Sequence, residues 1–91
     1  MCRIKQSKRV LAADFSDGKV ILNLATYISH TLNPTASEVW DFCKRPRKIN
    51  EIIDFLHKRY NIDPQRARKD IKKLIGDLKK RELIQVLGRR D

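Results

Sequence analysis

The sequence has few of the residues on which metal binding and catalysis commonly depend. Its 91 residues include two cysteines, Cys2 and Cys43, and two histidines, His30 and His57, scattered along the chain. This scatter gives no metal-ligand spacing, and neither a Cys/His or Ser/His/Asp set nor a glycine-rich phosphate loop is visible. The sequence therefore predicts no disulfide, no metal or other cofactor, and no enzymatic activity.

Long hydrophobic runs are also missing. No stretch approaches the ~18 consecutive apolar residues that suggest a membrane span. The basic start MCRIKQSKRV is not followed by the long apolar segment of a signal peptide. We therefore expect a cytoplasmic protein without a membrane partner.

The length of the chain favours a single domain over residues 1–91. Neither a repeat nor a low-complexity segment divides it, and the connections are too short for a linker between domains. We expect a core from about residue 9 to about residue 87, with a mobile basic tail before it and a short tail after it.

Positive charge is the feature that the chain has in excess. Lysine and arginine total 21 residues against 11 aspartates and glutamates, so the net charge is +10 and the pI is about 10.1. Such a balance suggests a polyanionic or acidic partner, which could be nucleic acid, a membrane surface, or an acidic protein or peptide. The alternative is a basic surface with no specific partner.

Two apolar-rich segments near the start of the chain, residues 9–15 and 19–24, have the composition of strands. The sequence Ser16-Asp17-Gly18 separates them, and Asp-Gly between two such runs favours a tight hairpin. Residues 27–32 then alternate, so that Ile28, His30 and Leu32 point one way. We expect a third strand with this face toward a core and His30 in the core or at its rim.

Three helices are expected after the strands. Asn33 can cap the first with Pro34 at its first position, or Thr35 and Glu38 can form a capping box. Trp40 lies on the apolar face of this helix and is expected to be buried.

Pro46 separates the first helix from the second. One face of the second helix carries Ile49, Ile52, Ile53, Leu56 and Tyr60. The third helix, residues 64–81, is capped by Asp63 and has an apolar stripe. This stripe consists of Ala67, Ile71, Leu74, Ile75 and Leu78. A short strand at residues 83–87 can follow. The order predicts an α+β, winged helix-turn-helix-like fold, with a three-stranded antiparallel sheet followed by three helices.

Four stretches in this order resemble the PqqD family, the peptide-recognition elements of ribosomally made, post-translationally modified peptides. They are DGKVILN, LNPTASEVW, INEIIDFLHKRYNID and DIKKLIGDLKKRELI. The resemblance implies a non-catalytic domain that binds the leader segment of a precursor peptide. The leader would add as an antiparallel strand on the third strand, beside the third helix, and be delivered to a modifying enzyme or leader peptidase.

Within the family, the chain is most similar to the stand-alone leader-binding proteins of lasso-peptide biosynthesis. Quinone-cofactor and radical-enzyme pathways are the alternatives. The resemblance places the peptide site on one strand and one helix. The expected site residues are Tyr27, Ile28, Ser29, His30, Thr31, Arg66, Asp70, Lys73, Leu74 and Asp77.

The charged residues of the third helix allow a simpler interpretation. Asp70 and Lys73 belong to one flank of the apolar stripe, and Arg68 and Lys72 belong to the other. Either flank could be a solvated face stabilised by weak pairs three or four residues apart. The sequence does not decide which flank faces a peptide.

Winged-helix DNA binding is the main alternative function. It is disfavoured because basic residues are spread over the whole chain, and because Asp70, Asp77 and Glu82 interrupt the basic faces of the third helix. Binding to a membrane surface is disfavoured because no helix has a bulky apolar face beyond the one that it needs for packing in the core. The protein is expected to be a monomer or a weak dimer, since an exposed edge strand can pair with a second copy.

Overall fold

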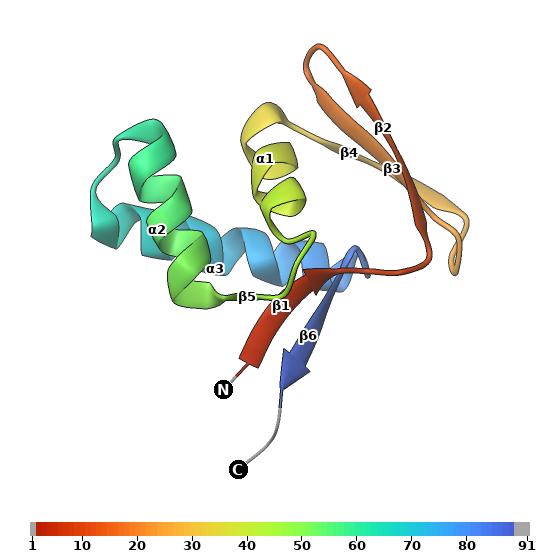
Figure 1. Ribbon diagram of the computed structural model, residues 1–91. Helices are drawn as coiled ribbons and strands as arrows, with labels where there is room; N and C mark the ends of the chain where they lie inside the picture. Colours follow the sequence, from red (N-terminus) through yellow and green to blue (C-terminus); the bar gives the residue numbers. More distant parts are fainter. Residues whose placement is uncertain (1, 89–91) are drawn as a thin grey trace.

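The computed structural model describes residues 2–88, so most of the expected C-terminal tail lies outside the described residues. The fold is α+β, as predicted, with three helices and two antiparallel three-stranded sheets (Figure 1). The element order is β1 (Cys2–Gln6), β2 (Val10–Phe15), β3 (Gly18–Asn23), β4 (Ile28–Leu32), α1 (Pro34–Phe42), β5 (Arg47–Lys48), α2 (Ile49–Tyr60), α3 (Pro64–Lys80) and β6 (Ile84–Gly88).

Strands β2, β3 and β4 form the predicted sheet, in that order. Ser16 and Asp17 make a two-residue turn that places Phe15 opposite Gly18. Gly18 has φ 135°, and a Cβ there would lie 1.9 Å from the carbonyl oxygen of Leu32. The position therefore requires glycine, both for its backbone conformation and for the close approach of β4.

The third predicted strand begins one residue later than expected. Tyr27 has φ 61° and ends the turn before Ile28, so the prediction that it belongs to the strand was wrong. The side-chain oxygen of Asn23 accepts hydrogen bonds from the N–H groups of Ala25 (2.8 Å) and Thr26 (3.3 Å). These bonds hold the turn locally and delay the start of β4.

The second sheet was not predicted. Its order is β5-β1-β6, and β1 consists of residues that were expected to form a polar mobile tail. Ile4 in this strand is only 5% exposed and belongs to the core. The partners of β1 lie more than forty positions away in the chain, at Arg47–Lys48 and Ile84–Gly88. No local pattern in the sequence could indicate such pairings.

Helices α1 and α3 begin where Asn33 and Asp63 predicted. The Asn33 side chain accepts the N–H of Ala36 at 2.8 Å, and the Asp63 carboxylate accepts the N–H groups of Gln65 and Arg66. The expected stripe of α3 is buried at Ala67, Ile71, Ile75 and Leu78, while Leu74 is half-buried.

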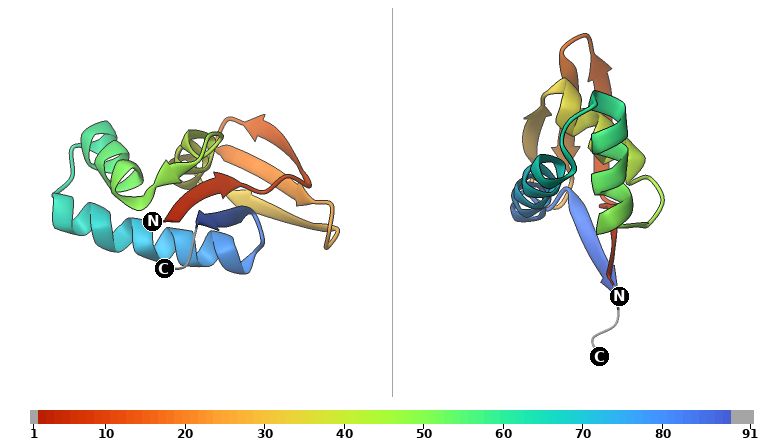
Figure 2. Two further views of the ribbon diagram at one scale, coloured as in Figure 1. Left: turned by 60° about the horizontal axis from the view of Figure 1, so that its bottom comes forward. Right: turned by 90° about the vertical axis from the view of Figure 1, so that its left-hand side faces the viewer.

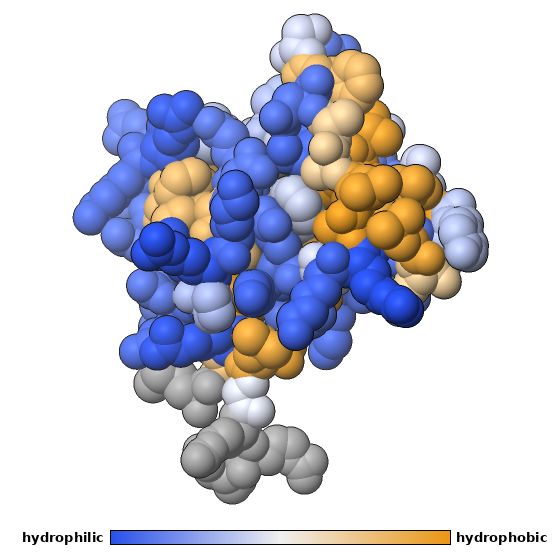
Figure 3. All heavy atoms as spheres, turned by 45° about the vertical axis from the view of Figure 1, so that its right-hand side comes forward, coloured by the Kyte–Doolittle hydropathy of each residue, from blue (hydrophilic) through white to orange (hydrophobic). Residues whose placement is uncertain are grey.

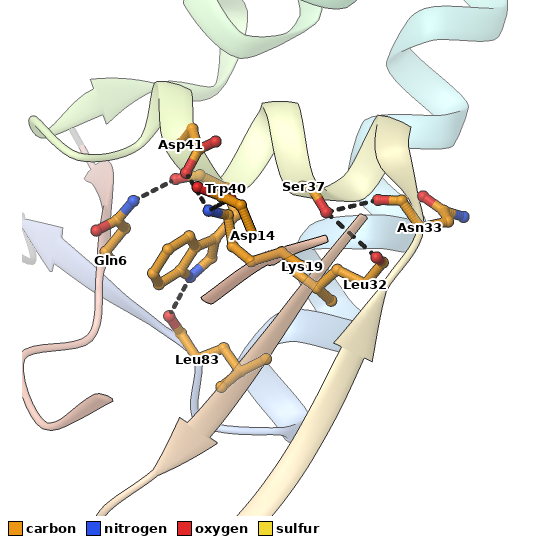
Figure 4. A network of polar contacts seen from close by, with 9 residues as sticks. All are labelled: Gln6, Asp14, Lys19, Leu32, Asn33, Ser37, Trp40, Asp41 and Leu83. Carbon is orange, nitrogen blue, oxygen red and sulfur yellow. Dashed lines mark hydrogen bonds and ion pairs between the residues drawn. The ribbon is translucent and has the colours of Figure 1, made fainter. Parts of the chain in front are cut away.

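Helix α1 lies between the β2-β3-β4 sheet on one side and helices α2 and α3 on the other (Figures 1 and 2). Trp40 of α1 is buried, as predicted, and its indole Nε1–H donates a 2.9 Å hydrogen bond to the carbonyl of Leu83. The Gln6 side chain donates to the carbonyl of Trp40 at 2.8 Å (Figure 4). These bonds connect α1 to one end of the second sheet, where Gln6 of β1 pairs with Ile84 of β6.

A buried lysine that pairs with two exposed carboxylates fixes α1 against the first sheet. The Lys19 side chain is 6% exposed and pairs with Asp14 across the hairpin and with Asp41 on α1, at 3.2 Å (Figure 4). Its Nζ also lies 5.7 Å from the centroid of the Trp40 ring. Burial by itself would lower the pKa of Lys19, but the hydrogen bonds to Asp14 and Asp41 outweigh it and raise that pKa. The lysine therefore stays charged and holds the sheet in a defined position on α1.

Candidate functional site

The edge of β4 away from β3 is open within residues 2–88, because β4 is the last strand of its sheet. The Ser16-Asp17 turn between β2 and β3 sets the hydrogen-bonding pattern of the sheet, and so determines which backbone groups of β4 point to this edge. A two-residue turn makes Phe15 and Gly18 a hydrogen-bonded pair, and hydrogen-bonded and free positions then alternate along each strand. Gly18 and every second residue after it bond to β2, so the residues between them bond to β4.

The same alternation assigns the backbone groups of β4. Ile28, His30 and Leu32 stand opposite the β3 residues that bond to β4, so their groups are used within the sheet. Ser29 and Thr31 lie between them. Their N–H and C=O groups therefore point to the open edge, where an added strand could bond to them.

The side chains of β4 follow a gradient of burial. Leu32 is buried, His30 is half-buried, and Ile28 is 54% exposed, although all three share the face toward α1. The prediction of a rim position for His30 is confirmed. The prediction of a strand face turned to the core is correct only at the end nearest α1. Tyr27, the expected first site residue, lies in the preceding turn and is 81% exposed.

A cleft of about 480 Å³ begins where β4 ends. Asn33, the residue directly after β4, lines it together with Ala36 of α1. Leu56 of α2 and Ile62 before α3 contribute apolar surface on the opposite side. The cleft therefore offers an apolar interior within reach of the open edge.

Helix α3 supplies the charged part of the cleft. Of the five residues predicted from this helix, Arg66, Asp70 and Leu74 line it, and Lys73 and Asp77 do not. Arg66 Nε lies 3.8 Å from Asp70 Oδ2, and both side chains are largely exposed. The structure thus places the flank that carries Arg66 and Asp70 at the cleft, a choice that the sequence left open.

Tyr60, which shares one face of α2 with Ile52, Ile53 and Leu56, lines the cleft and was not among the predicted site residues. Its hydroxyl donates to the carboxylate of Glu38, which also accepts from the Arg59 guanidinium at 2.7 Å. Hydrogen bonds from Arg59 and then from Tyr60 lower the pKa of Glu38, and the bond to Glu38 raises the pKa of Tyr60. Glu38 and Tyr60 are far apart in the sequence, so spacing could not have indicated this pair.

The described residues were also compared with the requirements of a metal site, a reactive thiol and a membrane span. No group of three or more His, Cys, Asp or Glu side chains among them is arranged to hold a metal ion. Cys43 is buried, and burial, opposed by the charge of Arg47, raises the pKa of its thiol to about 11. None of the helices in this part of the chain is long and apolar enough to cross a membrane.

Comparison with known families decides the ancestry of the chain. The family model described as coenzyme PQQ synthesis protein D (PqqD) matches residues 18–84, from the start of β3 to the start of β6. The chain belongs to the PqqD family. Both components of the candidate site, the β4 edge and α3, lie within the matched residues. A comparison with curated proteins gave no match.

Two of the solved structures most similar to the chain are complexes with peptides. One is TbiB1 in complex with the TbiA(beta) leader peptide, which is 26% identical, with a TM-score of 0.80 over 96% of this chain and 99% of the other. Another is lasso peptide synthetase B1 complexed with the leader peptide, with 21% identity and a TM-score of 0.77 over 90% and 96% of the two chains.

A third solved structure is the PqqD truncation of Methylobacterium extorquens PqqCD, described as a stand-alone recognition element of ribosomally synthesised, modified peptides. It shares 16% identity and a TM-score of 0.74, over 91% of this chain and 88% of the other. At this identity the likeness concerns the fold alone. The predicted family and the observed fold therefore agree.

Proposed function

We propose that this protein binds the leader segment of a ribosomally made precursor peptide and presents it to an enzyme that modifies the peptide or removes the leader. The carrying observation is that Ser29 and Thr31 direct their backbone N–H and C=O groups to an open edge that adjoins the α3 cleft. Family membership supports this function, as do the similar structures that hold leader peptides.

Binding would follow strand addition. An extended leader running antiparallel to β4 would bond to Ser29 and Thr31, which fixes its register in steps of two residues. Apolar leader side chains at the end of the paired segment would enter the cleft near Leu74. Arg66 and Asp70 would select leader residues of opposite charge at its rim.

In the proposed function the protein binds the precursor peptide and catalyses no reaction itself. The modifying enzyme or leader peptidase is a partner to which the bound precursor is delivered, and a lasso-peptide pathway is the setting that the first two similar structures favour. The cytoplasm remains the predicted location.

DNA binding is the competing function, and one observation favours it. The exposed surface of α3 carries many cations, including Arg68, Lys69, Lys72 and Lys73, on a helix that a winged helix-turn-helix-like fold could present to a groove. If the Arg66 side of this helix entered DNA, the carboxylate of Asp70 would face the phosphate backbone. The repulsion between these negative charges opposes DNA binding through that side of the helix.

Fluorescence anisotropy separates the two functions. The probes are the labelled leader of the precursor peptide encoded beside this gene and a labelled random DNA duplex, each titrated at about 0.05 M and about 0.2 M salt. We expect sub-micromolar leader binding that changes little with salt, because backbone bonds and apolar contacts carry it. Salt-resistant duplex binding together with no leader binding would overturn the proposal.

A further inference from the structure

The outer face of the β2-β3-β4 sheet, on the side away from α1, is free of charged side chains. Strand alternation and register place seven residues on it. They are Leu11, Ala13, Phe15, Val20, Leu22, Ser29 and Thr31. Leu11 and Phe15 are 60% and 62% exposed. Apolar surface gathers over this sheet, whereas most of the remaining visible surface is hydrophilic (Figure 3). Such a patch on a chain with 35% charged residues suggests a contact surface.

The two ends of this outer face have opposite charge. Lys8 and Arg9 are exposed where the chain enters β2, and Arg9 is tied to the end of β3 by the bond from the Leu24 N–H to its carbonyl. Asp17 is exposed at the other end, in the β2–β3 turn, where it accepts a hydrogen bond from Ser16. Within residues 2–88, none of these three charged residues takes part in an ion pair.

We propose that two copies of this chain associate face to face through this outer face, with their strands antiparallel. A two-fold axis that lies in the interface and runs across the strands exchanges the two ends of the face. It places Lys8 and Arg9 of each copy over Asp17 of the other. The apolar centre packs on itself, in the manner of two aligned sheets.

Net charge opposes this association and keeps it weak. Each copy carries +10, but the charges lie outside the outer face, and at about 0.15 M salt the screening length is about 8 Å. Distant charges are therefore largely screened, while the paired ends and the apolar centre are in contact. We expect a dissociation constant of about 10 to 100 µM.

Sedimentation velocity of the whole chain tests the association. At about 0.15 M salt and from about 1 µM to about 300 µM protein, the mass should rise from the 10.7 kDa of one chain toward twice that value. Leu11→Lys should abolish this rise. Leu87→Lys makes the same change at an exposed leucine of β6 and should leave it intact. A mass that stays at one chain throughout, or equal effects of the two variants, would overturn the proposal.

Mixing two variants tests the antiparallel geometry. The double variant Lys8→Glu with Arg9→Glu, and the variant Asp17→Lys, each create like-charge contacts at both ends and should remain monomeric alone. An equimolar mixture of the two should associate, because both contacts are then attractive. Asp17→Asn, which suits the turn, should show intermediate association if Asp17→Lys proves misfolded by circular dichroism. Ala12→Pro removes an outward N–H at the β2 edge, and its side chain lies on the opposite face of the sheet, so this variant should still associate. Loss of dimer in a folded Ala12→Pro variant would instead show edge-to-edge pairing through β2 and overturn the proposed face.

Discussion

Within residues 2–88, both edges of the β2-β3-β4 sheet present unpaired backbone N–H and C=O groups, but the side chains around the two edges differ. On β4 the outward N–H and C=O groups belong to Ser29 and Thr31, and on β2 the same alternation assigns them to Val10, Ala12 and Asp14. The β4 edge continues into the cleft that α3 lines, whereas β2 lies on the far side of the sheet from it (Figure 2).

This difference shows what an edge needs in order to become a specific binding site. Backbone groups on any open edge can pair with any extended chain, so they supply affinity without choice. Selection requires side chains beside the edge, and only the β4 side has Arg66, Asp70 and Leu74 placed to supply them. We therefore expect a leader peptide to add to β4 and not to β2.

The strongest test changes one residue on each edge. Ser29→Pro removes an outward N–H and adds a ring at the open edge, while the bonds of β4 to β3 are kept. Leader binding measured by anisotropy should weaken about 30-fold or more. Ala12→Pro makes the matched change on β2 and should bind as the unaltered protein does. Equal losses in the two variants would mean that the edges are not distinguished.

The second test removes apolar surface from the cleft. Leu74→Ala deletes part of a half-buried side chain, so leader binding should weaken about 10-fold. Leu74→Met keeps the volume and should restore most of the affinity. The melting temperature of each variant, read by circular dichroism, separates loss of binding from loss of folding. Unchanged affinity in a folded Leu74→Ala variant would show that the leader does not enter the cleft.

The third test reverses a charge at the rim of the cleft. Asp70→Lys should weaken the binding of a leader with a basic residue near this position about 5-fold, and the effect should shrink as salt rises. Asp54→Lys is the matched control on α2, since Asp54 is also an exposed acid in an ion pair four residues away. If both variants changed the affinity alike, the effect would come from net charge and not from the site.

The smallest expected effect concerns Glu38, which accepts a hydrogen bond from the cleft residue Tyr60. Glu38 has a pKa below its ordinary value of 4.5 because Arg59 and Tyr60 donate hydrogen bonds to it. Its carboxylate therefore stabilises the fold fully above about pH 4.5, and this contribution disappears as the pH falls through the lower folded-state pKa.

Glu38→Gln should accordingly lower the melting temperature by about 2 °C at neutral pH. The difference from the unaltered protein should shrink as the pH falls below about 4.5 and through the lower folded-state pKa of Glu38. Asp54→Asn, the control for loss of an exposed acid, should change the melting temperature less. A difference for Glu38→Gln that grows toward low pH would contradict the assigned hydrogen bonds.

Features that depend on neighbours in the sequence were predictable. Asp17-Gly18 marked the hairpin, and Asn33 and Asp63 marked the helix starts, since turn and capping bonds join residues at most a few positions apart. The apolar spacing of α3 likewise identified its buried stripe. The resemblance in these ordered segments was enough to name the family.

Features that depend on distant partners were not predictable. In the sequence, β1 resembles a polar tail, because the strands that pair with it, β5 and β6, are distant in the chain. Tyr60 shares a helix face with apolar residues, and no local pattern shows that its hydrogen-bond partner Glu38 lies on another helix. The flank of α3 that lines the cleft was equally undecided until α1 and α2 were in place. By itself the sequence determined the three helices, the hairpin strands before them and the family, but not the second sheet. Only the tertiary structure decided which surfaces meet, because a site is built from side chains that long-range packing brings together.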